Sequence, residues 1–181
     1  MNVAPTSARA SQLAVASLFG ALGFNYGTWT SRLPALKSGL GLSTSQVSLL
    51  LLAAALGSVF SFPVTATLLQ RLGSRGASLA SGAVLPLMLL GLAFAPGFGF
   101  ACGVMLVHGV VASTMDVAMN AQGVEVEAVH AQPVMSRLHA VFSLGTMAGA
   151  LFASCMTGVT TSVPWHFGAA ALMVWAAVLL P

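Results

Sequence analysis

Six long runs of apolar residues dominate this sequence, and each is about long enough to cross a lipid bilayer as a helix. A hydrocarbon core of about 30 Å needs roughly 20 apolar residues, because each helical residue advances the chain by about 1.5 Å. Runs repeated this closely predict a multi-pass helical membrane protein. The expected spans cover residues 12–31, 46–69, 77–95, 98–123, 138–159 and 165–181.

The scarcity of charge supports this prediction. Only 5% of the 181 residues are charged and 57% are hydrophobic, whereas a soluble domain typically carries about 25% charged residues. A net charge of +3 is also too small to indicate a nucleic-acid partner. We therefore expect an all-α membrane protein, a single six-helix transmembrane domain over residues 1–181 with a short N-terminal tail at 1–11.

The arginine and lysine residues predict the orientation in the membrane. Cytoplasmic segments of membrane proteins usually carry the excess of positive charge. We therefore expect an inner-membrane protein with its N-terminus in the cytoplasm. This orientation places Arg9, Arg71, Arg75 and Arg137 inside and only Arg32 and Lys37 outside.

Asp116 is an acidic residue in the middle of an otherwise apolar run. A carboxylate at the centre of a membrane helix costs about 2.5 to 3.5 kcal/mol, so such residues usually face a bundle interior or a wet cavity. Removal from water favours the protonated form of a carboxyl group, which lets one aspartate take up and release a coupled proton. The alternative is a static partner of His108 or Arg137.

Polar and aromatic residues near Asp116 and in the first span are candidates for solute binding. Amide groups bind hydroxyl groups, and aromatic rings stack on apolar faces, which suits a sugar-like or other polar solute. For Trp29 and Arg32 the alternative is anchoring at the membrane interface. The predicted binding residues are Asn25, Tyr26, Trp29 and Asn120.

A fourth helix that continues past Gly123 would place Asp116, Asn120 and Glu127 on one face, because their spacings are close to multiples of a helical turn. Glu125 and Glu127 themselves are expected to be solvated. Glycine-rich faces predict close helix packing. One such face, at Gly145 and Gly149, is also the surface through which a homodimer could form.

The segment from Ala66 to Arg75 resembles the G-x-L-x-D-R-x-G-x-R motif of major facilitator superfamily transporters. Arg71, Gly73 and Arg75 match the motif, while Ala66 and Gln70 replace its first Gly and its Asp. The resemblance implies a loop that latches the inner ends of helices during conformational change. In physical terms, Gly73 permits a tight turn, and the two arginines can meet the carbonyl ends of helices.

Three further segments, at residues 25–37, 116–120 and 136–142, are similar to the fucose-permease-like branch of that superfamily. The resemblance covers nearly the whole chain but only the N-terminal six of the family's twelve helices. It implies proton coupling at Asp116 and sugar binding at Asn120. Thr30 stands where the permease has a second acid, in its first helix.

The sequence thus predicts proton-coupled transport of a small solute by alternating access. The expected partners are a small-molecule substrate, protons, the lipid bilayer, and a C-terminal half or a second copy of this chain. The alternatives are a truncated, non-transporting fragment, a membrane interaction protein, or a half-transporter acting as a homodimer. We find no nucleophile with a base, no metal-ligand cluster and no phosphate-binding loop, so we expect no enzyme, cofactor or metal.

Overall fold

The computed structural model describes residues 8–180, and this range is helical with no strand. Residues 1–7 of the predicted tail and Pro181, at the end of the sixth predicted span, lie outside the described residues. The prediction of an all-α bundle is confirmed. In chain order the helices are α1 (Ala8–Ser31), α2 (Leu33–Gly39), α3 (Thr44–Ala93), α4 (Phe98–His130), α5 (Met135–Val159) and α6 (Val163–Leu179).

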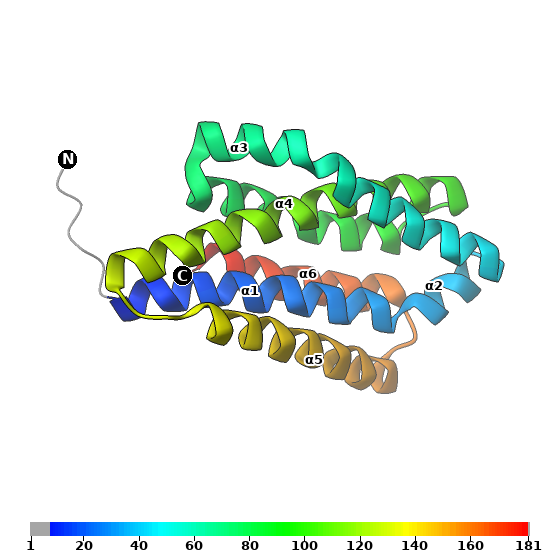
Figure 1. The fold of residues 1–181 in the computed structure, drawn as a ribbon. Coiled ribbons are helices and arrows are strands. Elements are labelled where there is room, and N and C mark those ends of the chain that lie inside the picture. Colours follow the sequence, from blue (N-terminus) through cyan, green and yellow to red (C-terminus); the bar gives the residue numbers. More distant parts are fainter. Residues whose placement is uncertain (1–7, 181) are drawn as a thin grey trace.

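The chain reverses direction inside α3, so this element makes two antiparallel arms at residues 44–72 and 74–93 (Figure 1). The reversal occurs at Gly73, which has φ 69° and ψ 178°. Essentially only glycine adopts these angles, since any Cβ would clash with the backbone. The two arms correspond to the second and third predicted spans, and the predicted turn at Gly73 is confirmed.

We expect Gly73→Ala to destabilise the protein by about 1 to 3 kcal/mol, because alanine is strained at this backbone conformation. The measurement is thermal unfolding of the purified protein in detergent. Gly39→Ala is the matched control, since Gly39 has no positive φ and an added Cβ there would meet nothing within 4 Å. Equal Tm values for Gly73→Ala and the wild type would contradict the assigned turn.

The helix boundaries differ from the predicted ones at several places. The first helix begins at Ala8, so residues 8–11 of the predicted tail are helical. The fourth continues to His130. The polar residues after Gly123 end the apolar run, but they are compatible with a helix. Pro34 lies in the first turn of the unpredicted helix α2, where proline is favoured.

Among the described helices, α3, α4 and α5 are long and apolar enough to cross a membrane, and α6 is a shorter apolar helix. Helix α1, which covers the first predicted span, is not among these candidates. The long helical segments alternate in direction, so α1 starts and α6 finishes at the same end of the bundle (Figure 1). This end also holds the turn at Gly73 and the loop between α4 and α5. The arginines predicted to be cytoplasmic therefore lie at one end, and Arg32 and Lys37 lie at the other.

Glycines bring the backbones of α1 and α5 into contact. A Cβ added at Gly23 would overlap the carbonyl oxygen of Phe142, and one at Gly149 would overlap that of Phe24. Gly145 likewise faces the backbone of Gly20. The expected role of these glycines in helix packing is confirmed, but the proposed dimer surface at Gly145 and Gly149 is wrong, because α1 already covers it.

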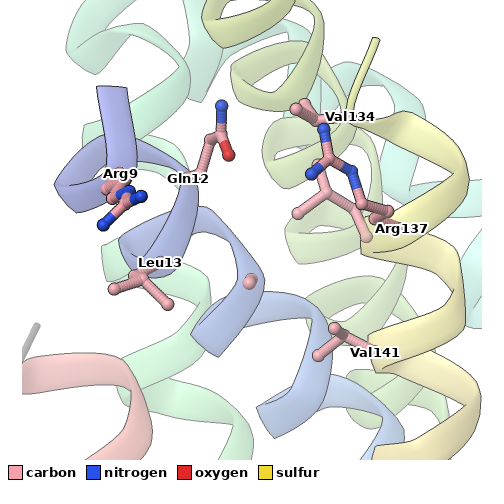
Figure 2. A pocket seen from close by; sticks show the side chains of 8 residues that line it. Arg9, Gln12, Leu13, Val134, Arg137 and Val141 are labelled. Atoms are coloured by element: carbon pink, nitrogen blue, oxygen red, sulfur yellow. The ribbon is translucent and has the colours of Figure 1, made fainter. Parts of the chain in front are cut away.

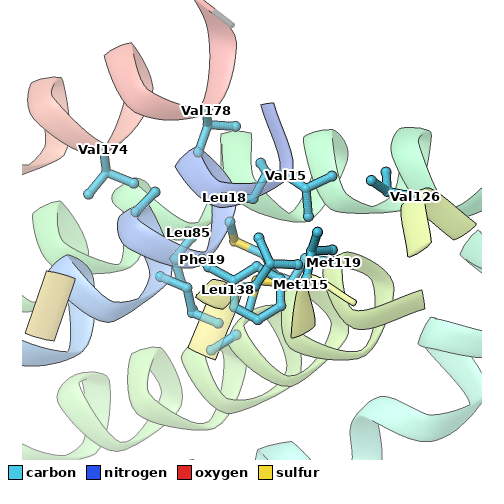
Figure 3. Packing of buried hydrophobic residues seen from close by; sticks show 14 residues of the cluster. Val15, Leu18, Phe19, Leu85, Met115, Met119, Val126, Leu138, Val174 and Val178 are labelled. Atoms are coloured by element: carbon cyan, nitrogen blue, oxygen red, sulfur yellow. The ribbon is translucent and has the colours of Figure 1, made fainter. Parts of the chain in front are cut away.

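The core extends along the inner face of α1. One cluster of buried residues joins α1 to α3, α4, α5 and α6 around Phe19, Leu85 and Met115 (Figure 3). A second cluster surrounds Trp29 and Phe167. Helix α1 is thus the central helix, and the polar residues that it carries are positioned by contacts with the other helices on both sides.

Candidate functional site

Asp116 lies on an exposed surface of the six-helix domain, near the middle of α4. The Asn120 side-chain amide, one turn later, donates to the Asp116 carboxylate at 3.2 Å and to the Asp116 backbone carbonyl at 2.8 Å. Among the described residues, Asp116 forms no ion pair. This carboxylate is therefore held by a neutral neighbour and remains open to the outside of the domain.

Two further polar side chains lie within electrostatic range of Asp116. The carboxylate interacts electrostatically with the half-buried Tyr26 of α1 and with the exposed His139 of α5. The His139 ring packs edge-on against Phe19, with 5.4 Å between ring centroids. We call the surface formed by Tyr26, Asp116, Asn120 and His139 the polar face. Three helices contribute to it, with α1 between α4 and α5.

Asn25 and Trp29 lie behind the polar face, inside the bundle. The Asn25 side-chain oxygen and Nε2 of His108 are 3.1 Å apart, and both residues are fully buried. The His108 ring also packs edge-on against Tyr26 and Trp29, with centroid distances of 5.8 and 5.5 Å. Of the four predicted binding residues, Asn120 contacts Asp116 and Tyr26 lies within electrostatic range of it, whereas Asn25 and Trp29 lie in the interior.

The structure shows other partners for the two groups considered as static partners of Asp116. His108 is paired with Asn25, and the Arg137 guanidinium donates to the Pro133 carbonyl at 3.1 Å. Trp29 and Arg32 are also buried at 5% and 3% exposure. Within this domain they are packed residues, which disfavours the alternative of interface anchors.

The two glutamates near the end of α4 differ in their surroundings. One carboxylate oxygen of Glu127 accepts hydrogen bonds from the backbone N–H groups of Val134 and Met135, the latter at 2.8 Å. These groups begin α5, where donors have no partner within the helix. The Ser74 hydroxyl donates to Glu125 at 2.8 Å. The expectation of a solvated acid holds for Glu125, which is exposed, and is wrong for Glu127, because the chain folds back so that the start of α5 donates to it.

The arginines of the predicted conformational loop have exposed side chains. Within residues 8–180, neither Arg71 nor Arg75 donates to a helix carbonyl, so the contact expected for them is not present in this conformation. Arg75 lines a pocket of about 620 Å³ together with Glu125 and His130. Their role in conformational change stays a prediction.

A second pocket, of about 260 Å³, lies between the starts of α1 and α5 (Figure 2). Arg9 and Arg137 stand on either side of it, and Leu13 and Val141 line its apolar wall. The Gln12 amide donates to the side-chain oxygen of Gln132 at 3.3 Å. This pocket belongs to the arginine-rich end of the bundle and contains no acidic residue.

Two histidines near Asp116 and Asn25, His139 and His108, are not among the predicted binding residues. His139 falls within the segment that carries the family resemblance, and that position could have marked it. For His108 the residue type offered no signal, because its partner Asn25 is 83 residues away in the chain. Only the packing of α1 against α4 brings the two together.

Comparisons with known proteins show transporter relatives. The chain is 33% identical over 153 residues to an uncharacterized transporter from Sinorhizobium fredii. This alignment covers 84% of this chain and 41% of the relative. It is 34% identical over 139 residues to an uncharacterized MFS-type transporter from Yersinia pestis, covering 77% of this chain and 36% of the relative. No family model and no solved structure matches the chain.

The chain spans about two fifths of the length of these relatives. Neither relative distinguishes the fucose-permease-like branch, so that finer assignment stays a prediction. The sequence similarity supports the broader family, and the helical bundle is that of an all-α membrane protein. The chain is a multi-pass membrane protein homologous to MFS-type transporters and corresponds to less than half of such a transporter.

Proposed function

We propose that the chain forms one half of a transporter that moves a small polar solute by alternating access, with the Asp116 carboxylate carrying a coupled proton. The observation that carries this proposal is an exposed carboxylate near the middle of a membrane-length helix. Contact with lipid would make the charge expensive at this depth. A water-filled cavity between this domain and a second six-helix unit removes that cost.

The side chains of the polar face favour binding of a neutral solute that carries hydroxyl groups. Asn120 and Tyr26 offer an amide and a phenol next to Asp116, and these groups donate to and accept from hydroxyls. In the proposal, Tyr26 and Asn120 contact the solute directly. Asn25 and Trp29 act through packing, since the buried pair of Asn25 and His108 supports the ring of Tyr26.

The second wall of the cavity is part of the proposal. In transporters built from repeated units, the binding site lies at the interface of the repeats near the membrane midplane. The wall is a C-terminal half or a second copy of the chain. In the proposed orientation, the arginine-rich end faces the cytoplasm of an inner membrane.

The proposal is tested with the full-length gene product in proteoliposomes. Radiolabelled neutral hexoses are supplied outside, with an inward proton gradient, and a trapped pH dye records proton entry. We expect one class of hexose to accumulate together with internal acidification. Absence of uptake and of acidification across the panel would favour the alternative of a non-transporting membrane protein. Hexose uptake that is the same with and without the proton gradient would support transport and contradict proton coupling.

A further inference from the structure

Most of the unpaired buried polar atoms of the described structure belong to the second half of α1, the turn after it and the start of α6. Seven buried side-chain nitrogen or oxygen atoms have no hydrogen-bond partner among the described residues, and six of them belong to residues 25–32 and His166. Buried polar groups are paired in the large majority of cases, so these atoms call for an explanation. The six atoms are Nδ2 of Asn25, Oγ1 of Thr28, Nε1 of Trp29, Nε of Arg32, and Nδ1 and Nε2 of His166.

These residues come from α1, the turn after it and the start of α6, and the end of α1 meets the start of α6 where Arg32 contacts Thr161. Four of them lie on one side of α1 and the turn that follows it, within about one third of the circumference, because they are spaced by three or four residues. These are residues 25, 28, 29 and 32. His166 is in the first turns of α6. Arg32 links the two helices, since its guanidinium donates to the Thr161 carbonyl just before α6 at 2.7 Å and interacts electrostatically with His166.

Arg32 is a buried cation without a carboxylate partner. Its side chain is 3% exposed, and no ion pair forms among the described residues. The three acids of the chain have other neighbours, namely Asn120 for Asp116, Ser74 for Glu125 and the start of α5 for Glu127. Burying a charge without a partner is costly. The carbonyl end of α1 offsets part of this cost but leaves the Nε donor unpaired.

The surroundings of Arg32 favour a negative ligand. Helix α6 begins beside it without a side-chain cap, so its first N–H groups add positive potential. Thr28 and His166 are both 0% exposed, and each has a donor to offer, a hydroxyl and one imidazole N–H. The rings of Phe152 and Phe167 pack against His166 at 5.2 and 5.4 Å, which restricts the ligand to a small one.

We propose that Thr28, Arg32 and His166 form an internal binding site for a small monovalent anion, separate from the polar face. The anion accepts hydrogen bonds from the Arg32 Nε–H and the Thr28 hydroxyl, and it neutralises the buried guanidinium. Because its ligands come from α1 and α6, the bound anion fastens the start of α6 to the central helix. The site is independent of transport, so its test does not rely on the transported solute.

Bromide is the probe, because its anomalous scattering locates it directly. In crystals of the full-length protein grown with sodium bromide, we expect an anomalous peak within hydrogen-bond distance of Arg32 Nε and Thr28 Oγ1. In solution, bromide at a hundredfold excess over its Kd should raise the Tm by about 5 °C or more. Water alone at this position, or an adventitious ion only at exposed arginines, would overturn the proposal.

Two variants separate binding from folding. Thr28→Val keeps the shape of the Thr28 side chain and leaves the charge of Arg32 in place. In this variant the bromide concentration needed for the same rise in Tm should be at least tenfold higher. Arg32→Gln should abolish the rise. Arg137→Gln, which removes an exposed arginine at the opposite end, is the matched control and should respond to bromide as the wild type does. An unchanged response in Thr28→Val and Arg32→Gln would also overturn the proposal.

Discussion

Replacing Asp116 with asparagine is expected to abolish proton-driven accumulation of the solute. Asparagine has nearly the same shape and can still pair with Asn120, but it cannot bind and release a proton. One pH unit is worth about 1.4 kcal/mol per proton, which is about tenfold accumulation for a one-proton symporter. The variant should reach only the level seen without a gradient, measured as uptake of labelled hexose into proteoliposomes.

Exchange of solute across the membrane provides the control for Asp116→Asn. Counterflow needs no net proton movement, so it should persist in the variant if the polar face still binds the solute. Glu125→Gln removes an acid from the same helix outside the polar face and should keep full accumulation. Accumulation by Asp116→Asn at the wild-type level would remove the proton-coupling role from this residue.

Replacing Glu127 with alanine is expected to produce the largest loss of stability among single acidic residues, about 2 to 3 kcal/mol. Its carboxylate accepts from the first two N–H groups around the start of α5. Hydrogen bonds to charged groups contribute about 1.5 to 3 kcal/mol, and removing the acceptor leaves half-buried donors unpaired. Thermal unfolding in detergent measures the effect.

Glu125→Ala is the matched control for Glu127→Ala, because it removes an acid two residues away. Glu125 is exposed and accepts one bond, from Ser74, so its loss should change stability by less than about 1 kcal/mol. Glu127→Gln retains an acceptor oxygen and should recover part of the loss. Similar Tm values for the two alanine variants would contradict the role of Glu127 in starting α5.

The helical fold follows from local features of the sequence. Long apolar runs predict helices that satisfy their own backbone groups, which a membrane demands, and Gly73 marks the one sharp reversal inside α3. Boundaries were less predictable. Hydropathy indicates which residues can lie in lipid, whereas α4 continues to His130 because the first helix-breaking residue after Gly123 is Pro133.

The candidate site was only partly predictable for a related reason. Asp116 and Asn120 are one turn apart, so their contact follows from helical spacing alone. The contact of Asn25 with His108 and the position of His139 depend on how α1 packs between α4 and α5. That packing is set by backbone contacts at Gly23 and Gly149, whose pairing a single sequence does not specify.

Transport by the proposed route requires that the polar face line a water-filled path. The most direct test places a cysteine at Asn120 in a protein whose Cys102 and Cys155 are alanine, and measures its reaction with a charged, membrane-impermeant thiol reagent in intact membranes. We predict rapid labelling of Asn120→Cys and none of Leu172→Cys, an exposed position on α6 expected to face lipid. If neither cysteine reacts with the reagent, the polar face is not in contact with water, and the proposed transport path is contradicted.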